Sequence, residues 1–470
     1  MKKPFLLFAT ISLLLSGSAF AGLKTHQAAD LVLGQPDFMT EADNLSQTGM
    51  NGPRDVAIDP RTGKVFVADS GNDRILRFAS YLSLSNGDPA EAVLGQDDFD
   101  TNDSTDLAQN RMNSPTRLYI DVDGRLWVTD LGNNRVLRFE NASFRPSGSP
   151  ADGVLGQPDF TSKGAGTTAT TTDTPFGITG SPNGTIWVAE RDNHRVLRFD
   201  NAALKVNGAP ADAVLGQPDF TSNGTGFAAT QMNTPIGVFF DSNGNLWVGE
   251  NGNSRVLRFD NAENIVVNGA TADGVLGAPD FTAPGADTTT VSTMRNASDL
   301  VVDSQGTLFV SDSFSRRVLG FLDAANKVDG ADADIVLGQP DFTTSSANLT
   351  AEGMINPTGL AVDPLGRLYV ADQGYHRVTR YSPDGTPTIT IKGKKSTRSS
   401  NLTLRGTALS DLLVTKVQVK GKRGGFKNAN GTTNWTYRLR GLDLGTTKVK
   451  VKATSLDGKT AIKTVRVRRR

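Results

Sequence analysis

The stretch "WVAERDNHRVLRFD" (residues 187–200) recurs in varied form along most of the chain. A second string, "VLGQPDF", recurs as well, and its six copies begin near Leu31 and end near Phe342. The first arginine of the "RVLRF" part falls at Arg74, Arg135, Arg195, Arg255, Arg317 and Arg377, which gives intervals of 60 to 62 residues. Two markers that share one period, six times each, indicate six structural repeats.

Each repeat contains short apolar runs separated by turn residues, as in "TPIGVFFD" (234–241), "NLWVGE" (245–250) and "SRVLRFD" (254–260). Asn-Gly and Asp-Gly pairs between such runs are typical of strands joined by tight hairpins. Four short strands in each unit of about 60 residues predict an all-β, six-bladed β-propeller. The first "LVLGQPDF" (31–38) precedes the first three-strand set, and no copy follows Tyr381. We therefore expect the N-terminal strand to close the ring by completing the sixth blade, which leaves no open edge.

The last repeat, "PTGLAVDPLGRLYVADQGYHRVTRY" (357–381), closely resembles the NHL repeat, and the six copies follow its core pattern. The resemblance covers roughly residues 30–385 and implies an NHL-type propeller. NHL propellers include protein-binding and RNA-binding modules, sensor domains and a few lyases, so the resemblance does not choose a function.

The N-terminus, "MKKPFLLFATISLLLSGSAFAG", has two lysines, a short apolar run and Ala19-Phe20-Ala21 at its end. This pattern predicts a signal peptide over residues 1–21 and a secreted protein, whether periplasmic, extracellular or on the cell surface. No other apolar run approaches the length of a membrane span. The propeller is expected over residues 22–385 and a second domain over 386–470.

Residues 386–470 hold 21 Lys and Arg but only three acidic residues, Asp411, Asp443 and Asp457. Valines alternate with basic residues in "KVKVK" (448–452) and "VRVR" (465–468), which is the pattern of half-buried strands. We expect a small Ig-like β-sandwich here. Its charge has three readings: a solvated face, docking to an anionic cell-surface polymer, or docking against the acidic propeller. The acidic propeller argues against a nucleic-acid partner.

A carboxylate precedes each repeat arginine by five residues, so Glu190 and Arg195 do not form a unique catalytic group. We interpret the six pairs as structural ties across a hairpin, since a buried charge needs a partner. They are Asp69/Arg74, Asp130/Arg135, Glu190/Arg195, Glu250/Arg255, Asp312/Arg317 and Asp372/Arg377.

The chain has no cysteine and three histidines, which excludes thiolate chemistry. His194 and His376 occupy the same position in the third and sixth repeats. The peptide-amidating lyases, NHL-like propellers, hold zinc with several histidines, and this chain lacks that set. We therefore expect no metal bound by histidine; calcium, which needs only oxygen ligands, stays open.

Differences between repeats carry the remaining information. Two residues after the proline that opens each repeat, the NHL pattern has glycine, as at Gly177, Gly237 and Gly359. The other repeats have larger side chains there. We expect a ligand to bind where these side chains gather, at one mouth of the propeller's central channel, on the face that carries the "QPDF" segments of the second marker (the "QPDF" inserts). The candidate binding residues are Asp55, Arg117, Asp299, Arg295, His194 and His376.

No nucleophile motif or phosphate-binding loop emerges from the sequence. The pattern therefore favours a secreted, non-catalytic binding or scaffold propeller that recognises a protein, peptide or glycan through loops of one face. The alternative is a calcium-dependent lyase or lactonase-type enzyme that acts at the propeller channel.

Overall fold

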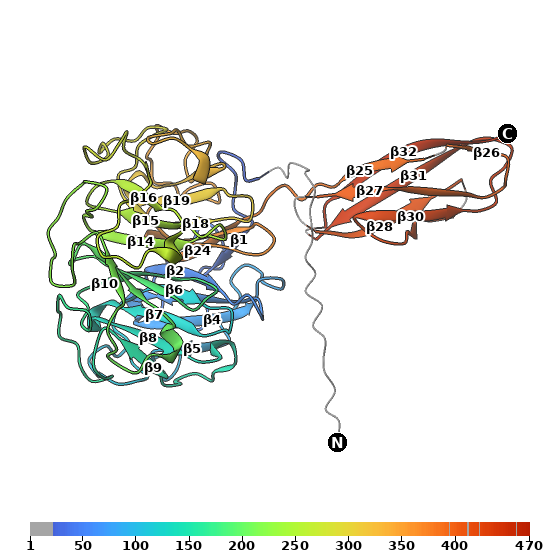
Figure 1. Ribbon diagram of the computed structural model, residues 1–470. Helices are drawn as coiled ribbons and strands as arrows, with labels where there is room; N and C mark the ends of the chain where they lie inside the picture. Colours follow the sequence, from blue (N-terminus) through green and yellow to red (C-terminus); the bar gives the residue numbers. More distant parts are fainter. Residues whose placement is uncertain (1–21, 394, 411–412, 423, 457) are drawn as a thin grey trace, which may run out of the picture. The chain divides into compact units, whose positions relative to one another are not determined.

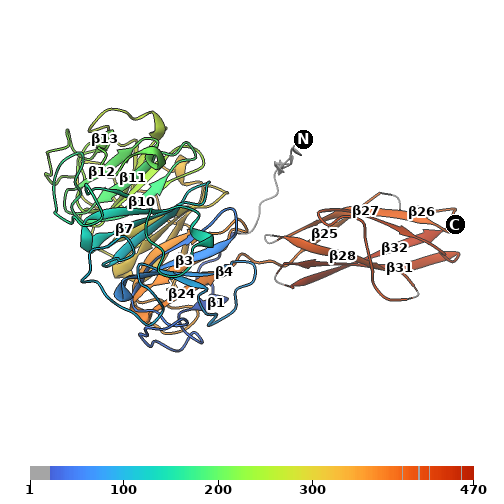
Figure 2. The same ribbon diagram turned by 90° about the horizontal axis from the view of Figure 1, so that it is seen from below.

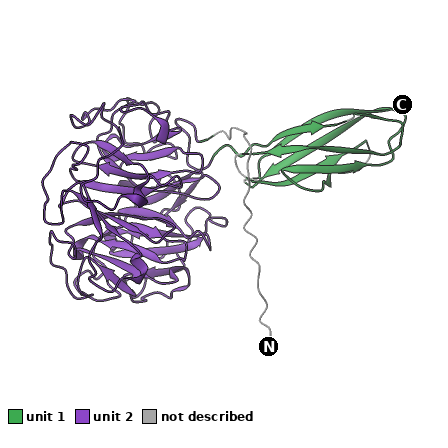
Figure 3. Ribbon diagram, in the orientation of Figure 1, with its two compact units in different colours: residues 1–22, 383–470 green, residues 23–382 purple. Residues whose placement is uncertain are grey.

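The computed structural model describes residues 22–470 except 394, 411, 412, 423 and 457. It contains two compact units, residues 23–382 and 383–470 (Figure 3). The first unit ends at Ser382, slightly before the boundary at 385 that the sequence predicts. The predicted signal peptide lies outside the described residues. In the part of the chain that is described, no helix has the length and apolar character to span a membrane.

The N-terminal unit consists of six four-stranded antiparallel sheets, numbered here in chain order (Figure 1). The first three sheets are β2 (Pro53–Ile58), β3 (Lys64–Asp69), β4 (Arg74–Ser80) and β5 (Ala92–Leu94); β6 (Pro115–Ile120), β7 (Leu126–Asp130), β8 (Arg135–Phe139) and β9 (Gly153–Leu155); and β10 (Pro175–Gly180), β11 (Ile186–Glu190), β12 (Arg195–Phe199) and β13 (Ala213–Leu215). The next two are β14 (Pro235–Phe240), β15 (Leu246–Glu250), β16 (Arg255–Phe259) and β17 (Gly274–Leu276); and β18 (Ala297–Val302), β19 (Leu308–Asp312), β20 (Arg317–Phe321) and β21 (Ile335–Leu337).

The sixth sheet joins the two ends of this unit. It contains β22 (Pro357–Val362), β23 (Leu368–Asp372), β24 (Arg377–Tyr381) and β1 (Leu31–Leu33). Leu31 pairs with Arg380 and Leu33 with Val378, so β1 lies beside β24 (Figure 2). The N-terminal strand therefore supplies the fourth strand of a sheet whose other strands come from the end of the unit.

Short turns and 3-10 helices connect the strands. In the hairpin between β14 and β15, Gly244 has a φ of +88°, a conformation that favours glycine, and its N–H donates to the Asp241 carbonyl. The 3-10 helices are η1 (Ser70–Asn72), η2 (Leu131–Asn133), η3 (Ala142–Phe144), η4 (Ala202–Leu204), η5 (Ala262–Asn264), η6 (Ser313–Ser315), η7 (Ala324–Asn326) and η8 (Gln373–Tyr375). The first, second, sixth and eighth of them follow the second strand of a sheet, and the others follow the third strand.

The hydrophobic core lies between neighbouring sheets, because both faces of most strands are buried. Each sheet shares an apolar cluster with the next one; Trp187 of the third sheet, for example, packs in one cluster with Val248 of the fourth. The sixth sheet shares a cluster with the first, in which Tyr369 and Val378 join Val56 and Val67. Packing between sheets therefore continues from the last sheet back to the first.

The C-terminal unit contains two further sheets. One is formed by β25 (Thr388–Lys392), β27 (Leu402–Leu409) and β30 (Asn434–Leu439). The other has the order β26 (Ser396–Thr397), β32 (Thr460–Arg469), β31 (Gly445–Ser455), β28 (Val414–Lys420) and β29 (Lys427–Asn428). Trp435, Val449, Val451 and Val467 are buried in a core of their own. In β31 and β32 the valines point inward and the basic residues between them are exposed or half-buried, as their alternation predicts.

Candidate functional site

The six carboxylate–arginine pairs are buried and tie together the parts of each repeat. Each pair joins the end of a sheet's second strand to the start of its third, with both side chains fully buried. In the first sheet, Arg74 Nε lies 2.7 Å from Asp69 Oδ2, and the Asn51 N–H donates to Asp69 Oδ1. Burial raises the pKa of Glu190 and of Glu250 to about 7, against the lowering effect of Arg195 and Arg255. These pairs face neighbouring backbone, which leaves no room for a substrate.

The same arginines also hold the "QPDF" inserts in place. Arg74 Nη1 donates to the carbonyl of Phe99, the last residue of the first sheet's insert, and Arg377 Nη1 donates to the Phe38 carbonyl at 2.9 Å. The aspartate of the motif closes its own turn: Asp219 Oδ1, for example, accepts the N–H groups of Thr221 and Ser222. The second sequence marker is thus explained by local structure.

His194 and His376 link neighbouring sheets and do not reach the central cavity. Each has a positive φ and places Nδ1 against the N–H of a residue just before the next sheet. At this repeated position a side chain accepts a hydrogen bond from the backbone N–H of a residue just before the next sheet, at 2.6 to 3.0 Å. The acceptor–donor pairs are Asp73–Ser114, Asn134–Thr174, His194–Thr234 and His376–Gly52. Burial lowers the pKa of His194, and Asp192 opposes this effect, so the neutral imidazole can accept the bond. Their predicted place at the channel mouth is therefore corrected: both are inter-sheet connectors.

Arg295 also lies apart from the cavity. Its side chain is partly exposed, and its Nε is 2.8 Å from Asp287 Oδ1 in the loop before the fifth sheet. This ion pair directs the guanidinium into the loop, so Arg295 does not join the residues that line the cavity.

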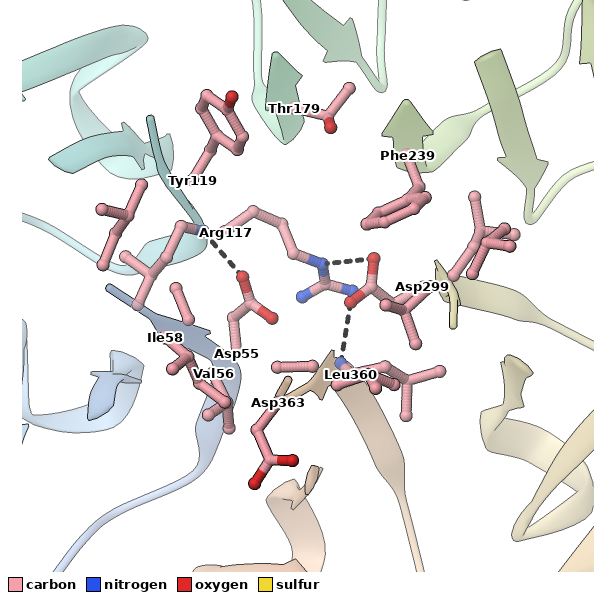
Figure 4. Close-up of a pocket in the computed structure, with 18 of the residues that line it drawn as sticks. Asp55, Val56, Ile58, Arg117, Tyr119, Thr179, Phe239, Asp299, Leu360 and Asp363 are labelled. Atoms are coloured by element: carbon pink, nitrogen blue, oxygen red, sulfur yellow. Dashed lines mark hydrogen bonds and ion pairs between the residues drawn. The ribbon is translucent and has the colours of Figure 1, made fainter. Parts of the chain in front are cut away.

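The other three predicted residues meet in a central cavity of about 360 Å³ (Figure 4). The first strands of all six sheets line this cavity, with apolar walls that include Val56, Leu118 and Leu360. Asp55, Arg117 and Asp299 form its floor and are only 3%, 2% and 5% exposed. The structure thus brings together three residues that lie up to 244 positions apart (299 minus 55).

Arg117 spans the cavity from the second sheet. Its Nε lies 3.4 Å from Asp299 Oδ1 of the fifth sheet. Its Nη1 donates to the Arg54 carbonyl at 2.8 Å, and its Nη2 donates to the carbonyls of Ser298 at 2.9 Å and Thr358 at 3.2 Å. One guanidinium therefore binds backbone of the first, fifth and sixth sheets, since a guanidinium offers five donors in a fixed planar arrangement.

The two aspartates bind the next sheet as well as facing the cavity. Asp55 Oδ2 accepts the Leu118 N–H at 2.7 Å, and Asp299 Oδ2 accepts the Leu360 N–H at 2.8 Å. Asp55 Oδ1 is buried and has no hydrogen-bond partner among the described residues. Burial, together with the Asp299 carboxylate, raises the pKa of Asp55 well above its usual range despite the nearby Arg117. Burial also raises the pKa of Asp299, and Arg117 opposes this effect.

Two further residues of this centre were missed by the sequence analysis. Phe176 of the third sheet lies 5.2 Å from the Arg117 guanidinium and 5.6 Å from that of Arg54, both measured to its ring centre. Burial, with Arg117 as a like charge, lowers the pKa of Arg54 to about 10. Arg54 and Phe176 each directly follow the proline that opens their repeat. Side chains at this position differ between repeats, so the comparison of repeats that singled out Asp55 could also have singled out these two residues.

The cavity extends away from the "QPDF" inserts. β5 ends at Leu94 opposite Ile75, so its insert lies at the end where β2 starts. The cavity instead continues from its floor to Pro60, Ser304 and Pro364 in the turns after the first strands. We call this side the hairpin-end face. The predicted site on the face of the inserts is corrected accordingly.

Exposed apolar side chains occur on the same hairpin-end face. The 3-10 helices that follow the third strands begin next to these turns; the Ala202 N–H, for example, donates to the Gly184 carbonyl at 3.0 Å. Apolar residues in and after these helices, and at the equivalent place in the first sheet, are 61% to 84% exposed; they are Leu82, Phe144, Leu204, Val206, Val266, Val267 and Val328. Exposed apolar residues that gather on one face commonly mark an interaction surface.

A metal ion does not fit the residues of the cavity. Calcium takes six to eight oxygen ligands. Over the described positions, no group of three or more His, Asp or Glu residues is arranged to hold an ion. At the cavity floor the positive charge is supplied by Arg117, which already pairs with Asp299. We therefore assign no metal-dependent step to this site.

Comparison with protein families finds two matches. The NHL repeat matches residues 50–78 and 112–139. The chain carries NHL repeats. The SMP-30/Gluconolactonase/LRE-like region matches residues 289–418, which begins before the fifth sheet and extends past Ser382 into the C-terminal unit. Together with the all-β structure, these matches are consistent with a propeller of the NHL type. The comparison with curated proteins gave no match.

The solved structures that this chain matches include two lyases and an extracellular domain. A streptogramin B lyase is 13% identical and has a TM-score of 0.41 over 77% of this chain and 99% of its own. Virginiamycin B lyase from Staphylococcus aureus is 13% identical with a TM-score of 0.38 over 83% and 95%. The extracellular domain of BT4673 from B. thetaiotaomicron, described as a one component system, is 13% identical with a TM-score of 0.40 over 95% and 59%. Similarity at 13% sequence identity does not indicate that this chain shares the activity of these proteins.

Proposed function

We propose that the N-terminal unit is a six-bladed propeller closed by β1 and that residues 383–470 form an Ig-like domain. Each of the six sheets shares an apolar cluster with the next one along the chain, and the sixth shares one with the first; this packing supports a closed ring. Two sheets around one core support the sandwich. The proposal includes export, which rests on the sequence of residues 1–21. N-terminal sequencing of the exported protein would show Gly22 first if cleavage follows Ala21.

We propose that this propeller is a binding module for a protein or peptide, with the hairpin-end face as its recognition surface. The observation that carries the proposal is the cavity of about 360 Å³, whose walls are apolar and whose floor is formed by the polar side chains of Asp55, Arg117 and Asp299. Such a site suits one partner side chain with an apolar stem and a hydrogen-bonding tip. The exposed apolar residues of the same face would then contact the rest of the partner.

The test measures binding of the full-length mature chain to a displayed random-peptide library. Val362 lines the cavity near its hairpin end, so Val362→Trp fills it; Leu204→Asp with Val266→Asp makes the face polar. Met39, which follows a "QPDF" insert and is 66% exposed, supplies the control Met39→Asp. We expect the first two variants to lose the selected peptides and the control to retain them. Equal binding by all variants would overturn the proposal.

An enzyme that uses the same cavity is the second candidate function. Asp55 favours it, because a buried carboxyl with a raised pKa and an unpartnered oxygen can hold a proton for transfer to a leaving group. The enzyme would then be a lyase or lactonase, as in the alternative that the sequence suggests, but its reaction would not depend on calcium. A panel of lactones and esters tests it: turnover that Asp55→Asn abolishes while peptide binding persists would favour the enzyme.

A further inference from the structure

The C-terminal unit has one sheet face that consists of basic and neutral side chains. The strands β28, β31 and β32 are adjacent in the five-stranded sheet (Figure 2). Their inward residues, such as Val419, Val451 and Val465, are buried. The outward residues that carry charge are Lys416, Lys420, Lys448, Lys450, Lys452, Arg466 and Arg468. None of the three strands contains an acidic residue.

The register of these strands places like charges directly opposite each other. Lys448 pairs with Arg466, and Lys420 pairs with Lys450. Like charges at directly opposed positions of a sheet destabilise it, because their side chains are only ~5 Å apart at the Cβ atoms. In the described part of the unit, the ion pairs Lys422–Asp443 and Lys459–Asp384 lie outside these strands, and neither involves any of these outward cations. The face therefore carries a repulsion that an anionic ligand would relieve.

We propose that this face, which we call the basic face, binds a linear anionic polysaccharide. Cations repeat at ~4.8 Å across the strands and at ~6.7 Å along them, so one extended chain with closely spaced carboxylate or sulfate groups can meet several at once. Between the cations lie threonines such as Thr446 and Thr464, whose hydroxyl groups can bond sugar hydroxyls.

The composition of the basic face disfavours two other polyanions. Single-stranded nucleic acid is held by aromatic side chains that stack on bases, and β28, β31 and β32 contain no aromatic residue. A membrane surface is held by apolar side chains inserted among the charges, and here Ile462 is the one exposed large apolar residue on the outward side. The inference is independent of the proposed function of the propeller, because it uses only residues of the C-terminal unit.

The experiment measures binding of the full-length mature chain to immobilised heparin, a sulfated polysaccharide, at several salt concentrations. The basic-face variant is Lys448→Gln/Lys450→Gln/Arg466→Gln. Its matched control, Lys392→Gln/Arg405→Gln/Arg438→Gln, removes three exposed charges from the outward side of β25, β27 and β30. We expect the basic-face variant to bind about 100-fold more weakly, since each cation near an anionic surface contributes roughly a fivefold factor. The control should change by less than about tenfold, with a salt dependence close to that of the wild type.

Equal weakening by both variants would show attraction by net charge alone and would overturn the basic face as the site. Tighter binding to a 30-nucleotide DNA or to vesicles with anionic phosphatidylglycerol than to heparin would overturn the choice of partner. Thermal unfolding of both variants checks that they fold. The basic-face variant should be no less stable than the wild type, because its substitutions remove opposed like charges.

Discussion

Arg117 of the second sheet reaches across the central cavity to Asp299 of the fifth, with Nε 3.4 Å from Oδ1. The same guanidinium binds carbonyls of the first, fifth and sixth sheets. It thereby forms, with Asp55 and Asp299, the floor of the cavity, which continues from there to the hairpin turns at Pro60, Ser304 and Pro364. The floor is thus at once a structural clamp and the polar end of the candidate site.

Arg117→Ala should lower the free energy of unfolding of the propeller by about 3–5 kcal/mol, because it leaves Asp299 as a buried charge without its partner. Chemical denaturation followed by tryptophan fluorescence measures this loss, since Trp127, Trp187 and Trp247 are buried between the sheets. Arg295→Ala, which removes a partly exposed arginine, is the control and should change stability by less than about 0.5 kcal/mol. A loss below about 1 kcal/mol for Arg117→Ala would contradict its role as a clamp.

Asp55→Asn should make the propeller progressively more stable than the wild type as the pH rises from about 4 toward neutral. Burial and Asp299 raise the pKa of Asp55 in the folded state above the value of about 4 in the unfolded chain. In that window the unfolded chain loses its proton first, so the wild type loses stability with rising pH and the asparagine variant does not. Urea unfolding of both proteins at a series of pH values measures the difference. A difference that stays constant or shrinks as the pH rises would show that the pKa is not raised.

His194→Asn should keep nearly full stability, whereas His194→Ala should cost about 1–2 kcal/mol. Asparagine already fills this position at Asn134, where Oδ1 accepts the Thr174 N–H at 2.8 Å. Alanine leaves the Thr234 N–H without its acceptor, and an unmade hydrogen bond costs about that amount. Thermal unfolding with and without EDTA completes the test. A melting temperature that falls in EDTA would contradict the connector role and indicate a bound metal.

Gly359→Ala should destabilise the contact between the sixth and first sheets. A Cβ at Gly359 would overlap the Arg54 carbonyl oxygen and the Asp55 Cα, both of which are backbone atoms held by the sheet. Such overpacking costs about 1–3 kcal/mol or more. Gly164→Ala is the matched control, since a Cβ there meets nothing within 4 Å. Equal melting temperatures for the two variants would show that the sheets approach less closely than described.

Much of the fold could be predicted from the sequence, because the repeat itself carries the information. The period of about 60 residues and the "RVLRF" marker gave the strands and the all-β class, and the NHL assignment is confirmed by the family match. The unpaired first copy of "VLGQPDF" led to the expectation that the N-terminal strand joins the last repeat, and β1 pairs with β24. Repetition also explained Glu190 and Arg195, because six identical pairs cannot be one active site.

The site was predictable only in part. Comparing repeats singled out Asp55, Arg117 and Asp299, since a side chain replaces glycine at these positions. It also selected Arg295 and His194, whose side chains turn into a loop and toward the next sheet. Spacing fixes the register of a side chain along its strand, but its direction depends on partners in other sheets. For the same reason the sequence did not show that the cavity extends toward the hairpin turns, away from the "QPDF" inserts where a ligand was expected.

Hydrogen–deuterium exchange of the full-length chain, with and without a selected peptide, tests the central claim most directly. The account predicts that the peptide slows exchange in the hairpin turns around Pro60, Ser304 and Pro364 and in η4 and η5. Exchange in the "QPDF" inserts should stay unchanged. Protection confined to the inserts, with the turns unaffected, would contradict recognition at the hairpin-end face.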